Sequence, residues 1–244
     1  MRRTFADLHL RANNLDPAQV AKFAGKAAEL GYKMVATPLP PTTNGEEIRR
    51  LKAACSENGL DFVSRVDIRP RNQNDLLAML RKLRRKFEVL CALCETKEIA
   101  RQAAKDRRVD LLCFPFLDYR KRFFDRAEAE LACGGVAALE VDMRPMLVLE
   151  GPQRVRFLST LRREVAVALE FHVPLVVSSG ASEALLLRKP REIALLTSLF
   201  GLTGTEALNA VSNNPVGIVE RNREKLGANF IAPGIRIVKR GKDC

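Results

Sequence analysis

Two pairs of side chains in this sequence have the residue types and the spacing for metal-dependent hydrolysis. Asp7 and His9 lie two residues apart in a short apolar run near the start of the chain. Glu140 and Asp142 have the same spacing, so in a strand both carboxylates face the same side. Carboxylates and imidazoles bind catalytic metal ions, and a pair of carboxylates can also transfer protons. These four residues are the candidate metal ligands.

The remaining composition argues against a metal site. The 244 residues contain only one other histidine, His172, whereas a catalytic metal centre needs several ligands. Cys91 and Cys94 have no second pair and no nearby histidine, which predicts core thiols rather than half a zinc site. We therefore predict no intrinsic metal or cofactor. The alternatives are a metal-dependent phosphoesterase and, more weakly, a phosphosugar enzyme that binds its ligand at Ser178-Ser179-Gly180.

The elements that would position these residues alternate between strand and helix. Apolar runs of strand length recur between segments of helical period, and Asp16-Pro17 is typical of a helix start that Gly31 would end. Continuous apolar strands separated by helices predict a parallel sheet covered by helices. The sequence contains no Gly-x-Gly-x-x-Gly motif or P-loop, which disfavours a doubly wound open sheet. The predicted strands are 5–10, 32–37, 62–68, 89–93, 109–114, 137–141 and 174–178.

We therefore predict a TIM-barrel-like (β/α) barrel, imperfect, with about seven parallel strands. After residue 180 the pattern is helical, and Thr203 with Glu206 has the spacing of a capping box. No eighth strand is evident. The predicted domain is residues 1–234, and residues 235–244 are expected to form a flexible basic tail.

The net charge is strongly positive and is concentrated in two stretches. The chain has 41 Lys and Arg against 29 Asp and Glu, a net charge of +12. Residues 65–86 contain eight basic and two acidic residues, and residues 101–126 contain eight basic and four acidic residues. Because these stretches flank neighbouring strands, they should form one positive side that binds a polyanion.

The type of basic residue and the scarcity of aromatic residues define the expected partner. Arginine, whose planar fork suits phosphate oxygens, dominates the two stretches, whereas the chain has 6% aromatic residues and no Trp. This composition disfavours a module that mainly stacks bases and favours recognition of the backbone and shape of a folded RNA. Arg188, Lys189 and Arg191 are expected to form a third anion-binding patch together with Ser178-Ser179-Gly180.

Several motifs together resemble the archaeal ribonuclease P protein component 3 family, which is shared with the corresponding eukaryotic subunit. The similarity extends over nearly the whole chain, and Arg188-Lys189-Pro190-Arg191 is its most specific part. The motifs are Asp7-Leu8-His9, Met143-Arg144-Pro145-Met146-Leu147, Val176-Val177-Ser178-Ser179-Gly180-Ala181, Leu187-Arg188-Lys189-Pro190-Arg191-Glu192-Ile193 and Ser212-Asn213-Asn214-Pro215.

The resemblance implies a barrel related to polymerase-and-histidinol-phosphatase hydrolases in which the metal centre is not retained. It also implies a subunit of the ribonucleoprotein that removes 5′ leaders from precursor tRNA, in which the RNA is catalytic and this chain has no catalytic site. The implied partners are ribonuclease P RNA, precursor tRNA, a Pop5-type subunit and further protein subunits. Mg²⁺ is expected only through the RNA.

The predicted RNA-binding residues come from the resemblance and from the basic stretches. Arg188, Arg191, Arg120, Lys121 and Arg144 match basic positions of the family, and Arg101 lies near one. The basic stretches and the late loop add Lys189, Arg122, Arg81, Arg84 and Arg85. Asp7 and His9 are then structural. The chain has no apolar run long enough to span a membrane and no signal peptide pattern, and its scattered cysteines suit a reducing compartment, so we expect a cytoplasmic protein without membrane contact.

Overall fold

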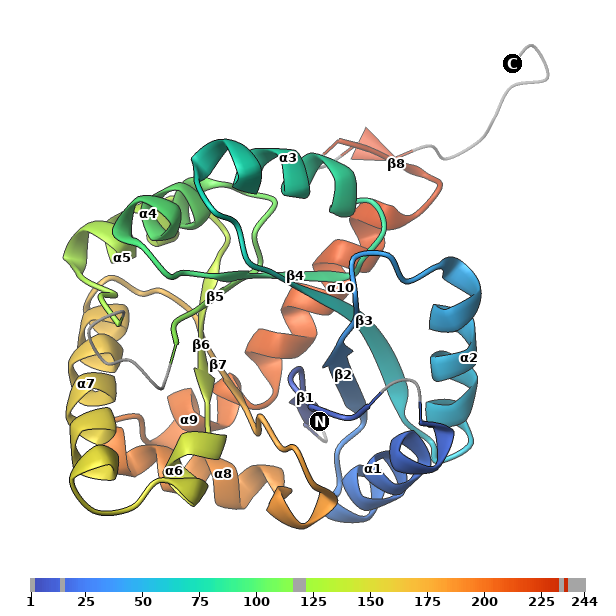
Figure 1. Cartoon of the computed structure of the whole chain (residues 1–244), viewed down its shortest axis with the longest axis horizontal. Helices are drawn as coiled ribbons and strands as arrows, with labels where there is room; N and C mark the ends of the chain where they lie inside the picture. Colours follow the sequence, from blue (N-terminus) through green and yellow to red (C-terminus); the bar gives the residue numbers. More distant parts are fainter. Residues whose placement is uncertain (1–2, 14–15, 116–121, 233–234, 237–244) are drawn as a thin grey trace.

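The computed structural model describes residues 3–13, 16–115, 122–232 and 235–236. In these ranges strands and helices alternate as the apolar runs predict (Figure 1). All seven predicted strands are present, and those predicted at 5–10, 109–114 and 174–178 are shorter than the apolar runs that contain them. The strands are β1 (Ala6–Asp7), β2 (Met34–Pro38), β3 (Asp61–Ile68), β4 (Val89–Leu93), β5 (Leu111–Cys113), β6 (Ala138–Asp142), β7 (Leu175–Ser178), β8 (Phe230–Ala232) and β9 (Ile235–Arg236).

The helices surround the sheet on its outer side, apart from α10, which crosses behind the strands in Figure 1. Two short 3₁₀ helices, η2 (Ala184–Leu186) and η3 (Thr197–Phe200), lie among the late helices. The α-helices are α1 (Pro17–Leu30), α2 (Gly45–Ser56), α3 (Gln73–Leu83), α4 (Lys97–Lys105), α5 (Arg126–Cys133), α6 (Arg144–Val148), α7 (Gly151–Glu170), α8 (Pro190–Leu196), α9 (Gly204–Ala210) and α10 (Asn213–Leu226).

The first seven strands form one parallel sheet in sequence order, which is the order of a (β/α) barrel. Among the described residues β7 and β1 form no ladder, so the barrel is nearly closed. Two hydrogen bonds bridge this gap. The Ser179 amide donates to Asp7 Oδ1 at 3.1 Å, and the Arg11 amide donates to the Ala181 carbonyl at 2.8 Å. The prediction of an imperfect TIM-barrel-like fold is confirmed.

The barrel has a narrow interior core and a larger outer core beneath the helices. The interior core is small and apolar, with Leu8, Val63 and Val176 among its members, and Ile218 and Val219 of α10 belong to it. Helix α10 therefore covers the amino ends of the strands. We call this end of the barrel the closed end, and the end formed by the carboxyl ends of the strands the mouth. In most barrel enzymes the mouth is the catalytic end.

Hydrogen bonds of α10 to the starts of the strands fix it over the closed end. The Asn222 side chain donates to the Glu88 carbonyl and to Asp110 Oδ1, both at 2.8 Å. Arg223 binds Asp61 at 2.5 and 2.7 Å and Glu88 at 2.6 Å. Because Asp61, Glu88 and Asp110 lie at or just before the first residues of β3, β4 and β5, one helix connects three neighbouring strands.

The sequence patterns that predict where helices begin and end are confirmed in part. Asp16 caps α1 by accepting from the amides of Ala18 and Gln19, and Gly31 ends the helix with a φ of +95°. Helix α9 begins where predicted, but Thr203 makes no side-chain capping bond, so the predicted capping box is wrong in its hydrogen bonds. The helix starts at Gly204, whose φ of +60° shifts its first turn away from capping-box geometry.

The end of the described chain adds no eighth barrel strand. β8 and β9 pair with each other in an antiparallel hairpin, and the first residues of the expected tail, 235 and 236, belong to it. No helix among the described residues is both long and apolar enough to span a membrane. Cys91 and Cys94 are fully buried, which confirms that they are core thiols.

Candidate functional site

The centre of the barrel contains a buried arginine. Arg65 of β3 is fully buried and forms two bonds of 2.6 Å with the carboxylate of Glu140 on β6. Its remaining donors bind Asp67 at 2.6 Å and the Leu8 carbonyl at 2.8 Å. The guanidinium thus contacts β3, β6 and the residue that follows β1. It is a structural centre of the barrel interior, not part of the positive surface to which the sequence assigned it.

The arginine keeps Glu140 ionised in an apolar interior. Burial by itself raises the pKa of Glu140, but the adjacent Arg65 charge and its hydrogen bonds, with a further bond from Ser178, lower it to about 2. Burial also lowers the pKa of Arg65, yet Asp67 and Glu140 together raise it well above its ordinary value. Both groups therefore remain charged because each compensates the other.

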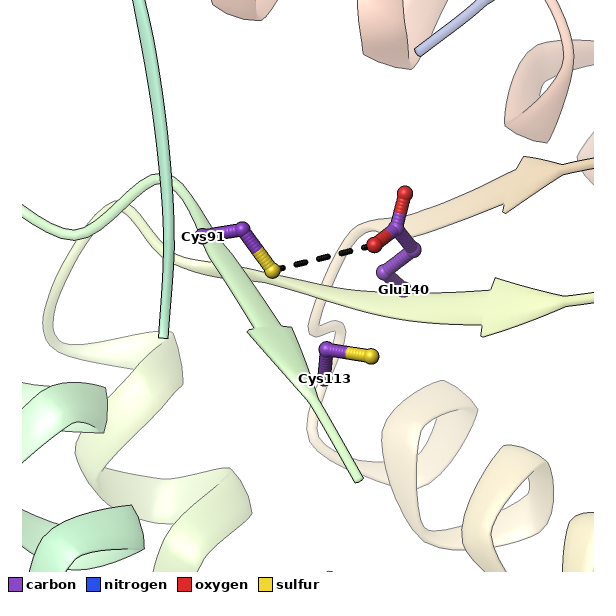
Figure 2. Close-up of side chains that lie close together, drawn as sticks. All are labelled: Cys91, Cys113 and Glu140. Carbon is purple, nitrogen blue, oxygen red and sulfur yellow. Dashed lines mark hydrogen bonds between the residues drawn. The ribbon is translucent and has the colours of Figure 1, made fainter. Parts of the chain in front are cut away.

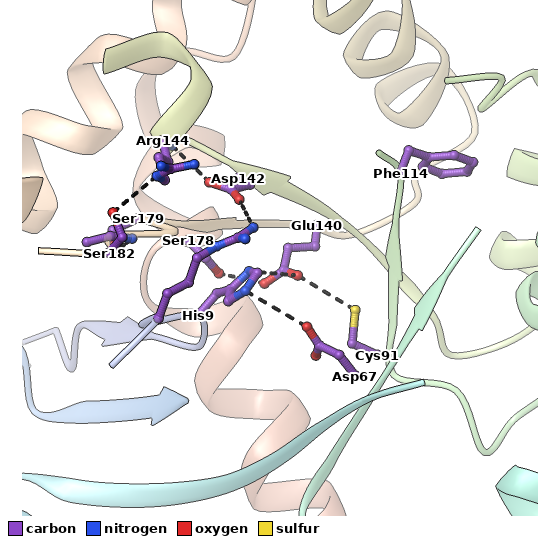
Figure 3. A network of polar contacts seen from close by, with 12 residues as sticks. His9, Asp67, Cys91, Phe114, Glu140, Asp142, Arg144, Ser178, Ser179 and Ser182 are labelled. Carbon is purple, nitrogen blue, oxygen red and sulfur yellow. Dashed lines mark hydrogen bonds and ion pairs between the residues drawn. The ribbon is translucent and has the colours of Figure 1, made fainter. Parts of the chain in front are cut away.

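The candidate metal ligands His9 and Asp7 lie beside this pair. His9 Nδ1 is 3.8 Å from Glu140, and His9 Nε2 is 3.8 Å from Asp67 (Figure 3). Asp7 is fully buried, and burial raises its pKa despite hydrogen bonds from Ser179 and His9. The contacts of Asp7 with the amides of Ser179 and His9 support its structural assignment.

A second possible donor set consists of Cys91, Cys113 and Glu140, whose ligand atoms lie within 4.8 Å of one another (Figure 2). Burial raises the pKa of Cys91 well above its usual value, so its sulfur remains a thiol, and it lies 3.7 Å from Glu140. Metal ligation requires thiolates, and Arg65 already binds both oxygens of Glu140. This set does not fit a metal ion while Arg65 is in place.

At the mouth, Asp142 organises the loops and does not face Glu140 as a catalytic partner. Its two oxygens accept from the Arg144 amide and from the Arg11 side chain, both at 2.8 Å (Figure 3). Arg144 also donates to Ser182 at 3.3 Å. Gly180 has a φ of +59°, and a Cβ there would lie 1.9 Å from Asp142 Oδ1, so only glycine fits. Glu140 and Asp142 were predicted to act as a carboxylate pair. In the structure Arg65 binds Glu140 and Arg11 binds Asp142.

A cavity of about 560 Å³ opens at the mouth, and its charges are paired. Its acidic side chains Asp67, Glu95 and Asp142 each have an arginine partner. The acidic groups at the mouth are therefore bound by arginines rather than left as open ligands.

Most of the predicted RNA-binding residues that the structure describes lie at the other end of the barrel. Arg81 lies in the last turn of α3, and Arg84 and Arg85 follow it before β4 begins. Arg191 stacks on Phe5, which precedes β1, at 5.8 Å from the ring centroid. These residues are at the closed end.

The third predicted patch is not one surface. The Arg188 carbonyl accepts from the Tyr32 hydroxyl at 3.1 Å, and Tyr32 precedes β2 at the closed end. Ser178 ends β7 and Ser179 follows it at the mouth, where they bind Glu140 and Asp7. The chain between residues 181 and 187 therefore leads from the mouth to the closed end, which separates the serines from the arginines.

Arg122 is a further correction, because it is buried and not available to a ligand. It forms an ion pair with the buried Glu164, donates to the Phe114 carbonyl at 3.0 Å and lies over the Phe157 ring. Arg101 is half exposed and pairs with Glu128 at 3.3 Å. Arg144 lies at the mouth, and Arg120 and Lys121 are outside the described residues.

Sequence reasoning missed the role of Arg65, although the chain contains a signal for it. Val63, Arg65 and Asp67 alternate within an apolar run, so they share one strand face. Val63 belongs to the interior core. An arginine on such a face must find carboxylates inside the barrel, and Asp67 and Glu140 are both in reach.

Taken together, the fold and its centre define a (β/α) barrel with a buried Arg65–Glu140 ion pair in its interior and a basic pocket at the closed end. Comparison with known proteins gives the family. The model of the RNase P subunit p30 family matches residues 4–226, and this chain belongs to that family.

Named relatives and solved structures agree with this assignment. Ribonuclease P protein component 3 of Methanosarcina barkeri is 29% identical over 91% of this chain and 90% of its own length. The protein of the same name from Methanosarcina acetivorans is 30% identical over 76% of each chain. A chain in the cryo-EM structure of archaeal ribonuclease P with mature tRNA has the same fold, with a TM-score of 0.82, 21% identity and coverage of 97% of this chain and 99% of that chain.

Proposed function

We propose that this chain is a protein subunit of ribonuclease P, the ribonucleoprotein that removes the 5′ leader from precursor tRNA by endonucleolytic cleavage. Its family and the names of its relatives support this function. In this proposal the RNA performs the chemistry, and the protein binds the RNA and stabilises its active fold.

The observation that supports a non-catalytic role is the Arg65–Glu140 pair. A hydrolase of this fold needs an open set of ligands at the barrel centre, whereas here a guanidinium binds the central carboxylate. The exposed arginines at the closed end instead offer planar donors that suit phosphate oxygens. This distribution disfavours the alternative of a metal-dependent phosphoesterase.

The proposal includes the composition of the complex. The partners are ribonuclease P RNA, precursor tRNA, a Pop5-type subunit and the other protein subunits, in the cytoplasm. Mg²⁺ enters through the RNA and not through a site on this chain. The RNA-binding residues proposed here are the exposed ones at the closed end, with Arg101, Arg144, Arg120 and Lys121 retained as further candidates.

Salt dependence of RNA binding tests this function. A protein that neutralises several phosphates loses affinity linearly on a logarithmic salt scale, with a slope of about 0.7–0.9 per phosphate. We expect the purified chain, alone and with its protein partner, to bind cognate ribonuclease P RNA with affinity that falls steeply between about 50 and 200 mM salt. Equal affinity at both salt concentrations, or binding no tighter than to an unrelated RNA of the same length, contradicts the proposal.

A further inference from the structure

A pocket of about 530 Å³ lies at the closed end, and three separate segments of the chain form it. The end of α3 provides Arg84 and Arg85, and the connection from α4 to β5 provides Arg107 and Arg108. The third segment runs from the end of α10 to β8. The two basic stretches of the sequence thus meet in one cavity. The residues of this closed-end pocket are Arg84, Arg85, Arg107, Arg108, Asn222, Lys225, Leu226, Gly227, Phe230 and Ile231.

Two of the arginines in the closed-end pocket are held in place by protein groups. Arg84 binds Asp110 at 2.5 Å and donates to the carbonyls of Phe87, Glu88 and Arg108 at 2.8–3.2 Å. Arg108 binds Asp106 through bonds of 2.9 and 2.6 Å. Because their geometry is already fixed, these side chains form a rigid wall for a ligand.

The other cations of the pocket have no such compensation. Arg85, Arg107 and Lys225 form no ion pair with any carboxylate in the described ranges. Burial lowers the pKa of Lys225, and the nearby charges of Arg221, Arg84 and Arg107 lower it further, against the opposite effect of Asp110. Like charges crowded in this way repel one another, and an anion bound between them relieves the repulsion.

The remaining wall of the closed-end pocket is apolar. It can contact the base or the ribose of a nucleotide, which a free anion does not have. Phe230 is half buried at the edge of the pocket, and Leu226 and the exposed Ile231 lie beside it. An unpaired base or a ribose can pack on an aromatic ring while its phosphate binds arginines. The pocket therefore combines the two kinds of contact that single-stranded RNA requires.

We propose that the closed-end pocket binds a phosphodiester of an unpaired RNA segment, with the attached base or ribose against Phe230. This inference rests on the proposed function and gives it a location, namely the end of the barrel opposite the mouth. Arg107, Arg108, Lys225 and Phe230 thereby join the candidate RNA-binding residues. Arg107 and Arg108 belong to the basic stretch at 101–126, whereas Lys225 and Phe230 lie outside both stretches.

A charge-matched comparison tests the proposal. The pocket variant replaces the uncompensated cations, Arg85→Gln, Arg107→Gln and Lys225→Gln. The control variant removes the same charges from exposed positions on α1, α2 and α7, Lys22→Gln, Arg49→Gln and Arg163→Gln. Binding of cognate ribonuclease P RNA is measured for both variants and for the native chain as a function of salt, and thermal unfolding verifies that each is folded.

The pocket variant is expected to bind the RNA at least roughly tenfold more weakly than the control, with a salt slope smaller by about two to three. Phe230→Leu, which keeps the apolar wall and removes the ring, is expected to weaken binding by about fivefold or more without changing the salt slope. Protection of the RNA phosphates by the native chain but not by the pocket variant would identify the bound segment.

Other results overturn the proposal in distinguishable ways. If the native chain binds the RNA but the pocket and control variants have equal affinity and slope, the pocket proposal fails and the proposed function stands. If the native chain itself does not bind the RNA, the proposed function fails as well. If inorganic phosphate binds the native chain and not the pocket variant while RNA affinity is unchanged, the pocket is a site for the free anion and the RNA assignment is wrong.

Discussion

Arg65 and Glu140 face each other across the barrel interior and are joined by two bonds of 2.6 Å, with both side chains fully buried. The pair places the Arg65 guanidinium among the carboxylates that a hydrolase of this fold would use as metal ligands. Its consequence is a barrel whose centre is structural. In the proposed function the RNA contacts lie on the surface instead, among the arginines of the closed end.

Breaking this pair should destabilise the fold strongly. Arg65→Met leaves the buried Glu140 carboxylate without its cation, which costs about 3–5 kcal/mol of the free energy of unfolding in urea titrations. Glu140→Gln leaves the guanidinium with Asp67 as a carboxylate partner, so it should cost less than Arg65→Met. The double variant Arg65→Met/Glu140→Gln should lose clearly less than the sum of the two. Strictly additive losses would show that the two side chains are not energetically coupled.

Gly180→Ala tests the contact between the loop after β7 and Asp142. The added Cβ would overlap Asp142 Oδ1, and the positive φ adds about 1–2 kcal/mol of strain. Gly201→Ala is the matched control, because Gly201 has a φ of +90° but no atom within 4 Å of the added Cβ. We expect Gly180→Ala to lower the melting temperature well beyond the control. Equal losses would mean that Asp142 moves aside without cost.

Arg122→Ala should impair the fold rather than RNA binding. Its loss leaves Glu164 buried without its cation, and we expect about 3–5 kcal/mol of destabilisation. Arg126→Ala, which breaks an exposed pair with Glu170, should cost no more than about 1 kcal/mol. RNA affinity of the folded fraction should be unchanged by Arg122→Ala. A selective loss of affinity with native stability would restore Arg122 to the RNA-binding set.

Glu128 should make stability depend on pH. Burial and the neighbouring Asp125 raise its pKa from 4.5 to about 7. Between these values the folded chain keeps a proton that the unfolded chain releases, so the contribution of Glu128 to stability falls as the pH rises from about 4.5 to 7. Glu128→Gln, which cannot ionise, should therefore gain stability relative to the native chain across this window. Parallel pH profiles of the two proteins would contradict the raised pKa.

The strands could be predicted from the sequence because each is a continuous apolar run, and a parallel barrel buries both faces of its strands. The run at 62–68 was assigned correctly, yet Arg65 within it was counted as surface charge. Strand periodicity places Arg65 and Asp67 on one face but does not say which face turns inward or which distant carboxylate meets it. Only the curvature of the sheet into a barrel brings Glu140 of β6 to Arg65 of β3, because β4 and β5 separate these strands in the sheet.

The existence of a basic surface could be predicted from the sequence, but its position on the barrel could not. The concentration of arginines at 65–86 and 101–126 indicated a polyanion site, and Arg84 and Arg85 of the first stretch do meet Arg107 and Arg108 of the second. Lys225 is far away in sequence and joins them only because α10 folds back over the closed end. The expected union of Ser178 with Arg188 was wrong because the path of the intervening chain takes them to opposite ends of the barrel.

Reconstituted cleavage of precursor tRNA measures most directly whether this chain works as a ribonuclease P subunit. Cognate ribonuclease P RNA and the other protein subunits are assembled at fixed Mg²⁺ and salt concentrations with or without this chain, and the rate of 5′ leader removal is followed. We expect the rate to drop when the chain is omitted and to return when it is added, whereas the chain without RNA cleaves nothing. An unchanged rate on omission, or leader removal by the chain alone, would contradict the proposed function.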